Sequence, residues 1–170
     1  MSEFTKETFN DAVQRYFGAI AREHGWTLVQ RRDDLFRMSS RCAVMEIDYH
    51  QGWHTRSMNI IVRPANDPPG SPRQIGVWPI ASFNGESFQY VPWEQNAEGF
   101  FEEAEYMANL AKRFCVPYLS AERTDWELVK SHWERESEKA IEKIKGYKFP
   151  SGAQKRWHLP PPASFLLSFF

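Results

Sequence analysis

The chain has 170 residues, of which 42% are hydrophobic and 25% charged, so it is long enough to bury a sizeable core within one domain. Its 21 Lys and Arg nearly balance its 22 Asp and Glu, which is not the positive excess expected of a nucleic-acid-binding domain. No stretch reaches the roughly 18 apolar residues of a membrane span, and MSEFTKETF lacks the apolar run of a signal peptide, so we expect a soluble cytoplasmic protein without a membrane partner.

The first predicted element is an amphipathic helix that begins with Thr5 as its N-cap and ends at the His24-Gly25 pair. Phe4 is placed to contact Phe9 across the first turn. The apolar stripe of this helix needs a packing surface, because an isolated helix is marginally stable in water. The stripe consists of Phe9, Ala12, Val13, Tyr16, Phe17, Ile20 and Ala21.

Two short strands are predicted at residues 26–32 and 35–39, and a longer pair follows across residues 51–55. The longer pair alternates apolar and polar residues, which favours an antiparallel hairpin with one buried face. A register slip of one residue would bury Glu46 and Asp48 without partners, so the pattern fixes the pairing. The apolar face consists of Ala43, Met45, Ile47, Tyr49, Met58, Ile60 and Val62.

Residues 64–74 contain four prolines and one glycine, which predicts a surface loop. Two further strands are expected at residues 75–81 and 87–91, because Asn84-Gly85 between them is a hairpin signal. Pro79 restricts the first of these to a sheet edge or a bulge.

Two helices are predicted to follow, the first from Gln95 to a point before Pro117 and the second from Thr124 to Gly146. The stripe of the first consists of Phe100, Ala104, Met107, Ala108, Ala111, Phe114 and Cys115. The stripe of the second consists of Trp126, Val129, Trp133, Ala140, Ile141 and Ile144.

These elements predict an α+β fold. An antiparallel meander of four to six strands, in the order 1-2-3-4 for the first four, is packed on one face by the N-terminal helix and two C-terminal helices. Residues 1–147 form a single domain, and residues 148–170 form a proline-rich, apolar tail. The tail ends in FLLSFF, so we expect it to pack on its own domain or on a second copy in a homodimer.

Polar residues of the central hairpin form the first candidate site. Glu46, Asp48 and His50 share one face of a strand and His54 follows in the turn, which are residue types that ligate metals. The competing interpretation is an ordinary solvent-facing side of an antiparallel sheet, which is polar in any case. We favour that interpretation and assign no metal ligand.

Aromatic residues form the second candidate site. Trp53, Trp78 and Trp93 fall near turns or strand ends, and with Tyr49, Tyr90 and His54 they could line a binding surface. Aromatics make up 15% of the chain, which a heavily aromatic core would also explain.

Sequence signatures of common enzymes are missing. Cys42 and Cys115 lack metal-ligand spacing and lie within apolar patterns, which indicates reduced intracellular thiols. The chain has no Gly-x-Ser-x-Gly elbow, P-loop or dinucleotide fingerprint, so we expect no cofactor.

The helix TKETFNDAVQRYFGAIAREHGW followed by the strands RCAVMEIDYH and SMNIIVRP resembles small bacterial α+β proteins, among them families of immunity proteins that neutralise a cognate toxin. The resemblance is one of architecture, covers roughly residues 4–146 and carries over no functional residue. It implies a non-enzymatic intracellular binding protein that occludes a toxin or another protein. Glu46 and Asp48 would suit a basic partner. The alternative is a small-molecule-binding or metal-dependent enzyme that uses Asp48, His50 and His54.

Overall fold

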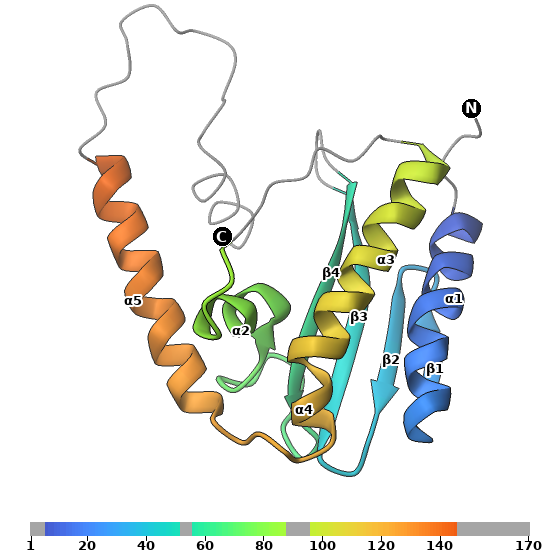
Figure 1. Cartoon of the computed structure of the whole chain (residues 1–170), viewed down its shortest axis with the longest axis horizontal. Helices are drawn as coiled ribbons and strands as arrows, with labels where there is room; N and C mark the ends of the chain where they lie inside the picture. Colours follow the sequence, from blue (N-terminus) through green and yellow to red (C-terminus); the bar gives the residue numbers. More distant parts are fainter. Residues whose placement is uncertain (1–5, 52–55, 88–95, 146–170) are drawn as a thin grey trace, which may run out of the picture.

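The computed structural model describes residues 6–51, 56–87 and 96–145, which comprise five helices and five strands. In chain order these are α1 (Lys6–His24), β1 (Thr27–Arg32), β2 (Leu35–Ser39), β3 (Ala43–Gln51), β4 (Arg56–Pro64), β5 (Ile75–Gly76), α2 (Val77–Phe83), α3 (Ala97–Phe114), α4 (Val116–Leu119) and α5 (Trp126–Lys145), and Figure 1 shows their arrangement.

The five strands form one antiparallel sheet in the order β1-β2-β3-β4-β5. The longest pairing joins β3 and β4, with Met45 opposite Val62 and Gln51 opposite Arg56. This confirms the predicted central hairpin and the order of the meander. β1 and β2 pair with a register shift between Gln30 and Arg32, which makes the edge strand irregular.

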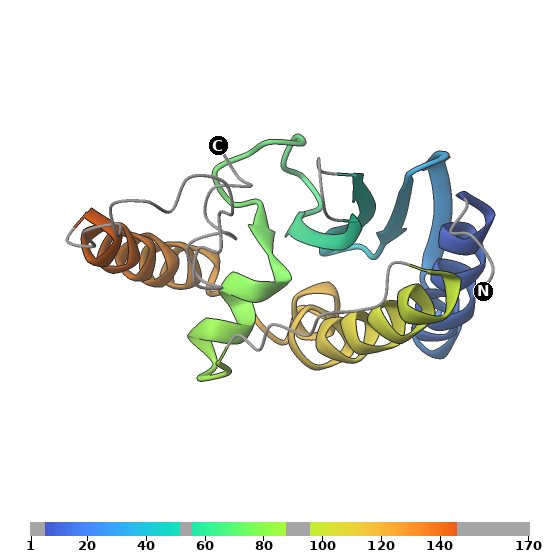
Figure 2. The ribbon, with the colours of Figure 1, turned by 90° about the horizontal axis from the view of Figure 1, so that it is seen from above.

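One face of the sheet is apolar and packs against helices. Met45, Ile47 and Ile60 are each 0% exposed on this face, as the alternation of residues predicts. α1 and α3 lie across it (Figures 1 and 2), and the ring of Phe9 on α1 lies 5.7 Å from the ring of Phe36 on β2. Burial of each large apolar side chain contributes about 1.5–3 kcal/mol, so this layer supplies much of the stability of the fold.

The predicted strand at residues 75–81 is wrong beyond Gly76, because the chain turns into α2 at Val77. Val77, Ile80 and Ala81 are buried, and the spacing i, i+3, i+4 places them on one side of a helix. Pro79 is tolerated because it lies in the first turn, where the backbone N–H groups have no partner within the helix.

The predicted hairpin at Asn84-Gly85 is likewise wrong. Asn84 is the C-cap of α2, and Gly85 has a φ of +85°, the conformation that commonly ends a helix at a glycine. Ser87 is not part of a strand, and the remainder of the second predicted strand lies outside the described residues.

The helix α3 confirms the predicted apolar stripe, all of which is buried. Its N-cap is Asn96, whose Oδ1 accepts a hydrogen bond of 2.8 Å from the backbone N–H of Gly99. The helix ends at Phe114, and the short helix α4 follows with Pro117 in its first turn.

The helix α5 begins at Trp126, with its N-cap one residue later than expected. The backbone oxygen of Asp125 accepts hydrogen bonds from Leu128 and Val129, which makes Asp125 the N-cap rather than Thr124. Trp126 and Val129 are buried, whereas Trp133, Ala140 and Ile141 are only half-buried. α5 packs against α2 and lies apart from α1 and α3, on the side of the molecule where β5 and α2 are found (Figure 2).

The tail at residues 148–170 lies outside the described residues, as do Phe4 and Thr5. Among the helices in the described ranges, none combines the length and apolar content that crossing a bilayer requires.

Candidate functional site

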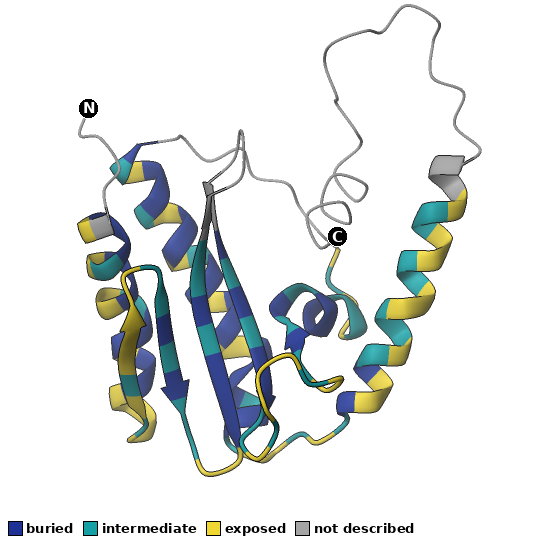
Figure 3. Ribbon diagram, turned by 180° about the vertical axis from the view of Figure 1, so that it is seen from behind, coloured by how far each residue is buried: buried dark blue, intermediate teal, exposed yellow. Residues whose placement is uncertain are grey.

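The side of the sheet that faces away from α1 and α3 is called here the open face, and Figure 3 looks onto it. The register places Val29, Arg37, Glu46 and Ile61 in one row across β1 to β4. Val29 is 41% exposed, and the other three side chains are half-buried. This row is therefore a surface with both apolar and charged groups.

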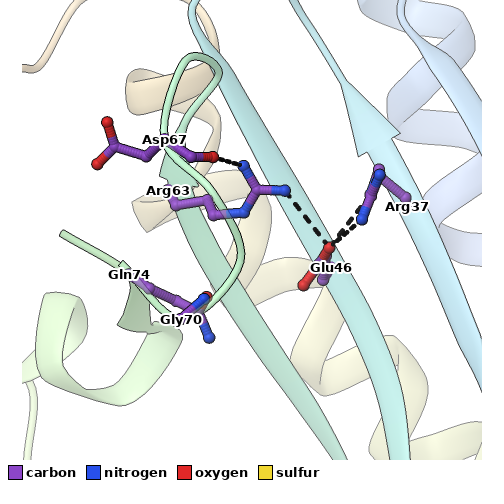
Figure 4. Close-up of polar contacts among 6 residues, drawn as sticks. All are labelled: Arg37, Glu46, Arg63, Asp67, Gly70 and Gln74. Carbon is purple, nitrogen blue, oxygen red and sulfur yellow. Dashed lines mark hydrogen bonds and ion pairs between the residues drawn. The ribbon is translucent and has the colours of Figure 1, made fainter. Parts of the chain in front are cut away.

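Glu46 is held between two arginines of neighbouring strands (Figure 4). Its Oε1 accepts hydrogen bonds of 3.1 Å and 2.6 Å from Nε and Nη2 of Arg37, and lies 3.6 Å from Nη2 of Arg63. The side chains of Glu46 and Arg63 are 14% and 6% exposed, so this contact is screened less by water than a surface ion pair. The charge of Glu46 is compensated within the sheet, which reduces its attraction for a basic partner.

The loop between β4 and β5 passes beside Arg63 (Figure 4), and several of its residues hydrogen-bond to one another. Arg63 donates from Nη1 to the backbone oxygen of Asp67. The carboxylate of Asp67 accepts from Nε of Arg73 at 2.8 Å and from Oγ of Ser71 at 3.0 Å. Hydrogen bonds from Arg73 lower the pKa of Asp67, which keeps this carboxylate charged.

Beside this loop is an open hollow of about 540 Å³. Its lining combines proline rings with charged groups, and α5 contributes Glu127. None of the candidate site residues from the sequence lines it. The lining includes Asp67, Pro68, Pro69, Pro72, Arg73 and Glu127.

Of the polar candidates, Glu46 and Asp48 lie on the same side of β3, as the alternation predicts. Asp48 is half-buried, opposite Leu35 on one side and Asn59 on the other. His50 lies in β3, but its side chain and the whole of His54 are outside the described residues. Within the described part of the chain, no group of three His, Cys, Asp or Glu side chains is placed to hold a metal ion.

The aromatic candidates are not brought together in the described part of the structure. Trp78 is half-buried in α2, with its ring 6.2 Å from that of Tyr106 on α3. Tyr49 belongs to the helix-covered face, where its ring lies 5.8 Å from the rings of both Phe9 and Phe100. Trp53, Tyr90 and Trp93 lie outside the described residues, so the binding surface that they would line stays a prediction.

A buried carboxyl group was missed by the sequence interpretation. Glu103 on α3 is 6% exposed, and its Oε1 accepts a hydrogen bond of 3.0 Å from the backbone N–H of Met58 on β4. Burial raises the pKa of Glu103 to about 7. The signal was in the sequence, because Glu103 lies between Phe100 and Met107 in the apolar stripe of the helix.

The two cysteines are free thiols, with Cys42 exposed and Cys115 buried. Burial raises the pKa of the Cys115 thiol to about 12, so it is inert as a nucleophile in the folded chain.

Comparison with known proteins adds no relative: no protein-family model, curated protein sequence or solved structure was found to match this chain.

Proposed function

We propose that this chain is a non-enzymatic intracellular binding protein whose partner is a protein that contacts the open face of the sheet. The observation that carries the proposal is the exposure of Val29, at 41%, on the face of the sheet opposite to the one that packs against α1 and α3. Leu35 and Ile61 extend this apolar surface as half-buried side chains.

The charged groups of the open face support binding by being fixed before a partner arrives. Arg37, Glu46 and Arg63 hold one another in place, so little side-chain entropy is lost when a partner covers them. Because Glu46 is already compensated, we place apolar contact ahead of attraction for a basic partner. Occlusion of a toxin, as by an immunity protein, is one function that such a surface would serve.

The test is capture of a partner by the tagged chain from the source organism, with identification by mass spectrometry. Val29→Arg is compared with Leu128→Arg, because Val29 and Leu128 are both large exposed apolar residues, and Leu128 lies on α5 at 62% exposure. We expect one protein to be captured by the wild type and by Leu128→Arg, and lost from Val29→Arg.

Equal capture by both variants would move the binding surface away from the open face. Capture of no protein above a tag-only control would count against the binding function itself. A second copy of this chain is the competing occupant, and light scattering of the purified chain decides it: a dimer that Val29→Arg dissociates would make the partner a second copy.

A further inference from the structure

Within the described part of the chain, two different elements cover the outer edge of β4. β5 is only two residues long and pairs with Ile61 and Val62. Three residues before Ile61, the backbone N–H of Met58 donates to the carboxyl group of Glu103 on α3 instead. The side chain of a helix thus supplies the acceptor that a longer β5 would have provided, at the α3–β4 contact.

The surroundings of Glu103 disfavour its charged form. Phe100 lies one turn before it and Met107 one turn after it, and both are 4% exposed. The single N–H of Met58 opposes the effect of burial only in part, because an ionised carboxylate needs several donors to replace its water.

Among the described residues, no charged group compensates Glu103. α2 and β5 carry no titratable side chain, and no described side chain contributes a charge interaction to the raised pKa of Glu103. The side chains of His50 and Arg56, at the nearby ends of β3 and β4, lie outside the described residues. Other titratable groups lie on α3 itself or on elements near it. They include Glu7, Asp11 and Arg15 on α1, Tyr49 on β3, Tyr118 on α4, and Glu98, Glu102, Glu105 and Tyr106 on α3.

We propose that the contact between Glu103 and Met58 is a pH-sensitive closure of the β4 edge, which is tight while Glu103 is protonated and loosens when the carboxyl group ionises. This inference does not depend on the open face or on its partner. Loosening would expose the backbone of β4 where it approaches the connection to β3, and an uncovered strand edge is a surface on which another strand can pair.

The direction of the effect follows from the pKa of Glu103, which is higher in the closed state, at about 7, than the ordinary value of 4.5 that an opened, hydrated state would have. The closed state therefore binds the proton more tightly, and the closure is strongest below pH 4.5. It weakens as the pH rises to about 7, by at most about tenfold per pH unit in the opening equilibrium.

The test is hydrogen exchange of the Met58 amide in the full chain by NMR, corrected for the intrinsic dependence of exchange on pH. We expect the protection factor of the wild type to fall between pH 5 and pH 7 by up to about a hundredfold, the value for two pH units. Glu103→Gln keeps an oxygen acceptor for Met58 but cannot ionise, so its protection factor should not change with pH. Glu102→Gln, one residue away and exposed, should behave as the wild type does.

A second measurement covers the outcome in which Glu103→Gln does not fold. The carbon-13 shift of the Glu103 carboxyl in the wild type should titrate near pH 7, and titration near pH 4.5 would overturn the proposal. The same fall in Met58 protection in Glu103→Gln would also overturn it, because the titrating group would then be another residue. Arg56→Gln tests whether the charge of Arg56 compensates Glu103. If it does, the Glu103 carboxyl titrates at higher pH in this variant than in the wild type, and the proposed absence of compensation is wrong.

Discussion

The two faces of the sheet are built from the same strands but differ in what holds them. On the covered face, Met45, Ile47 and Ile60 are completely buried against α1 and α3. On the open face, Arg37, Glu46 and Arg63 form an ionic group beneath and beside a loop. The covered face is stabilised by burial of apolar side chains, whereas the side chains of the open face are held by ion pairs and hydrogen bonds and are only partly buried.

The largest contrast should come from two neighbours in β2 that point to opposite faces. Phe36→Ala on the covered face should lower the free energy of unfolding by about 3–5 kcal/mol, because it leaves a cavity among buried rings. Leu35→Ala, on the open face, should lower it by about 1 kcal/mol, since that side chain is only half-buried. Urea unfolding of both variants measures the difference, and equal losses would mean that the open face is packed as well.

The next effect concerns the two glutamates of the sheet region, because Glu103 has no ion-pair partner among the described residues, whereas Glu46 has two arginines. The pKa of Glu103 is raised from 4.5 to about 7, so its contribution to stability is complete below pH 4.5 and is lost as the pH rises to 7. Relative to Glu103→Gln, the wild type should lose roughly 2–3 kcal/mol of unfolding free energy from pH 5 to pH 8. Urea unfolding of both proteins across this range measures it, and parallel curves would contradict it.

A smaller effect is expected within the ionic group of the open face. Arg63→Ala should cost about 2 kcal/mol, because it removes a buried guanidinium that contacts both Glu46 and the backbone oxygen of Asp67. Arg73→Ala also removes a partner of Asp67, but Arg73 is 45% exposed and its loss should cost less than the loss of Arg63. Thermal unfolding of the two variants compares their stabilities. An equal loss of stability would show that the burial of each arginine does not decide how much it contributes.

The smallest effect is expected at the exposed edge strand. Val29→Arg should change the unfolding free energy by less than about 0.5 kcal/mol, since the side chain already lies in water on the open face. Ile47→Arg, on the covered face, should prevent folding because the charge would be buried without a partner. Circular dichroism of both variants checks this, and a destabilised Val29→Arg would remove it as a clean probe of binding.

The parts of the fold that the sequence predicted are those with a single strong period. Ala43 to Tyr49 alternates strictly, and the stripe of α1 repeats every three to four residues, so each pattern fits one structure only. The segment IGVWPIA fits both the two-residue period of a strand and the longer period of a helix. Asn84-Gly85 can end a helix as well as form a hairpin, so local signals did not decide between helix and strand.

The candidate site was predicted less completely than the fold. The strand pattern placed Glu46 and Asp48 on the correct side, but their partners come from other strands and could not be inferred from spacing along one strand. Burial of Arg63 depends on the path of the loop at residues 64–74, which has no periodic signal. Glu103 could have been found, because a carboxylate within an apolar stripe is itself unusual.

The folded loop holds a Pro-x-x-Pro spacing in a conformation that is not polyproline II. Pro69 and Pro72 have the spacing that SH3-type domains read when a peptide is in the polyproline II conformation, which requires a negative φ throughout. Gly70 lies between them with a φ of +78°, and its backbone N–H donates at 2.7 Å to the side chain of Gln74. In the folded chain the loop is therefore bent between these two prolines, and a domain that binds extended proline peptides would require this loop to unfold first.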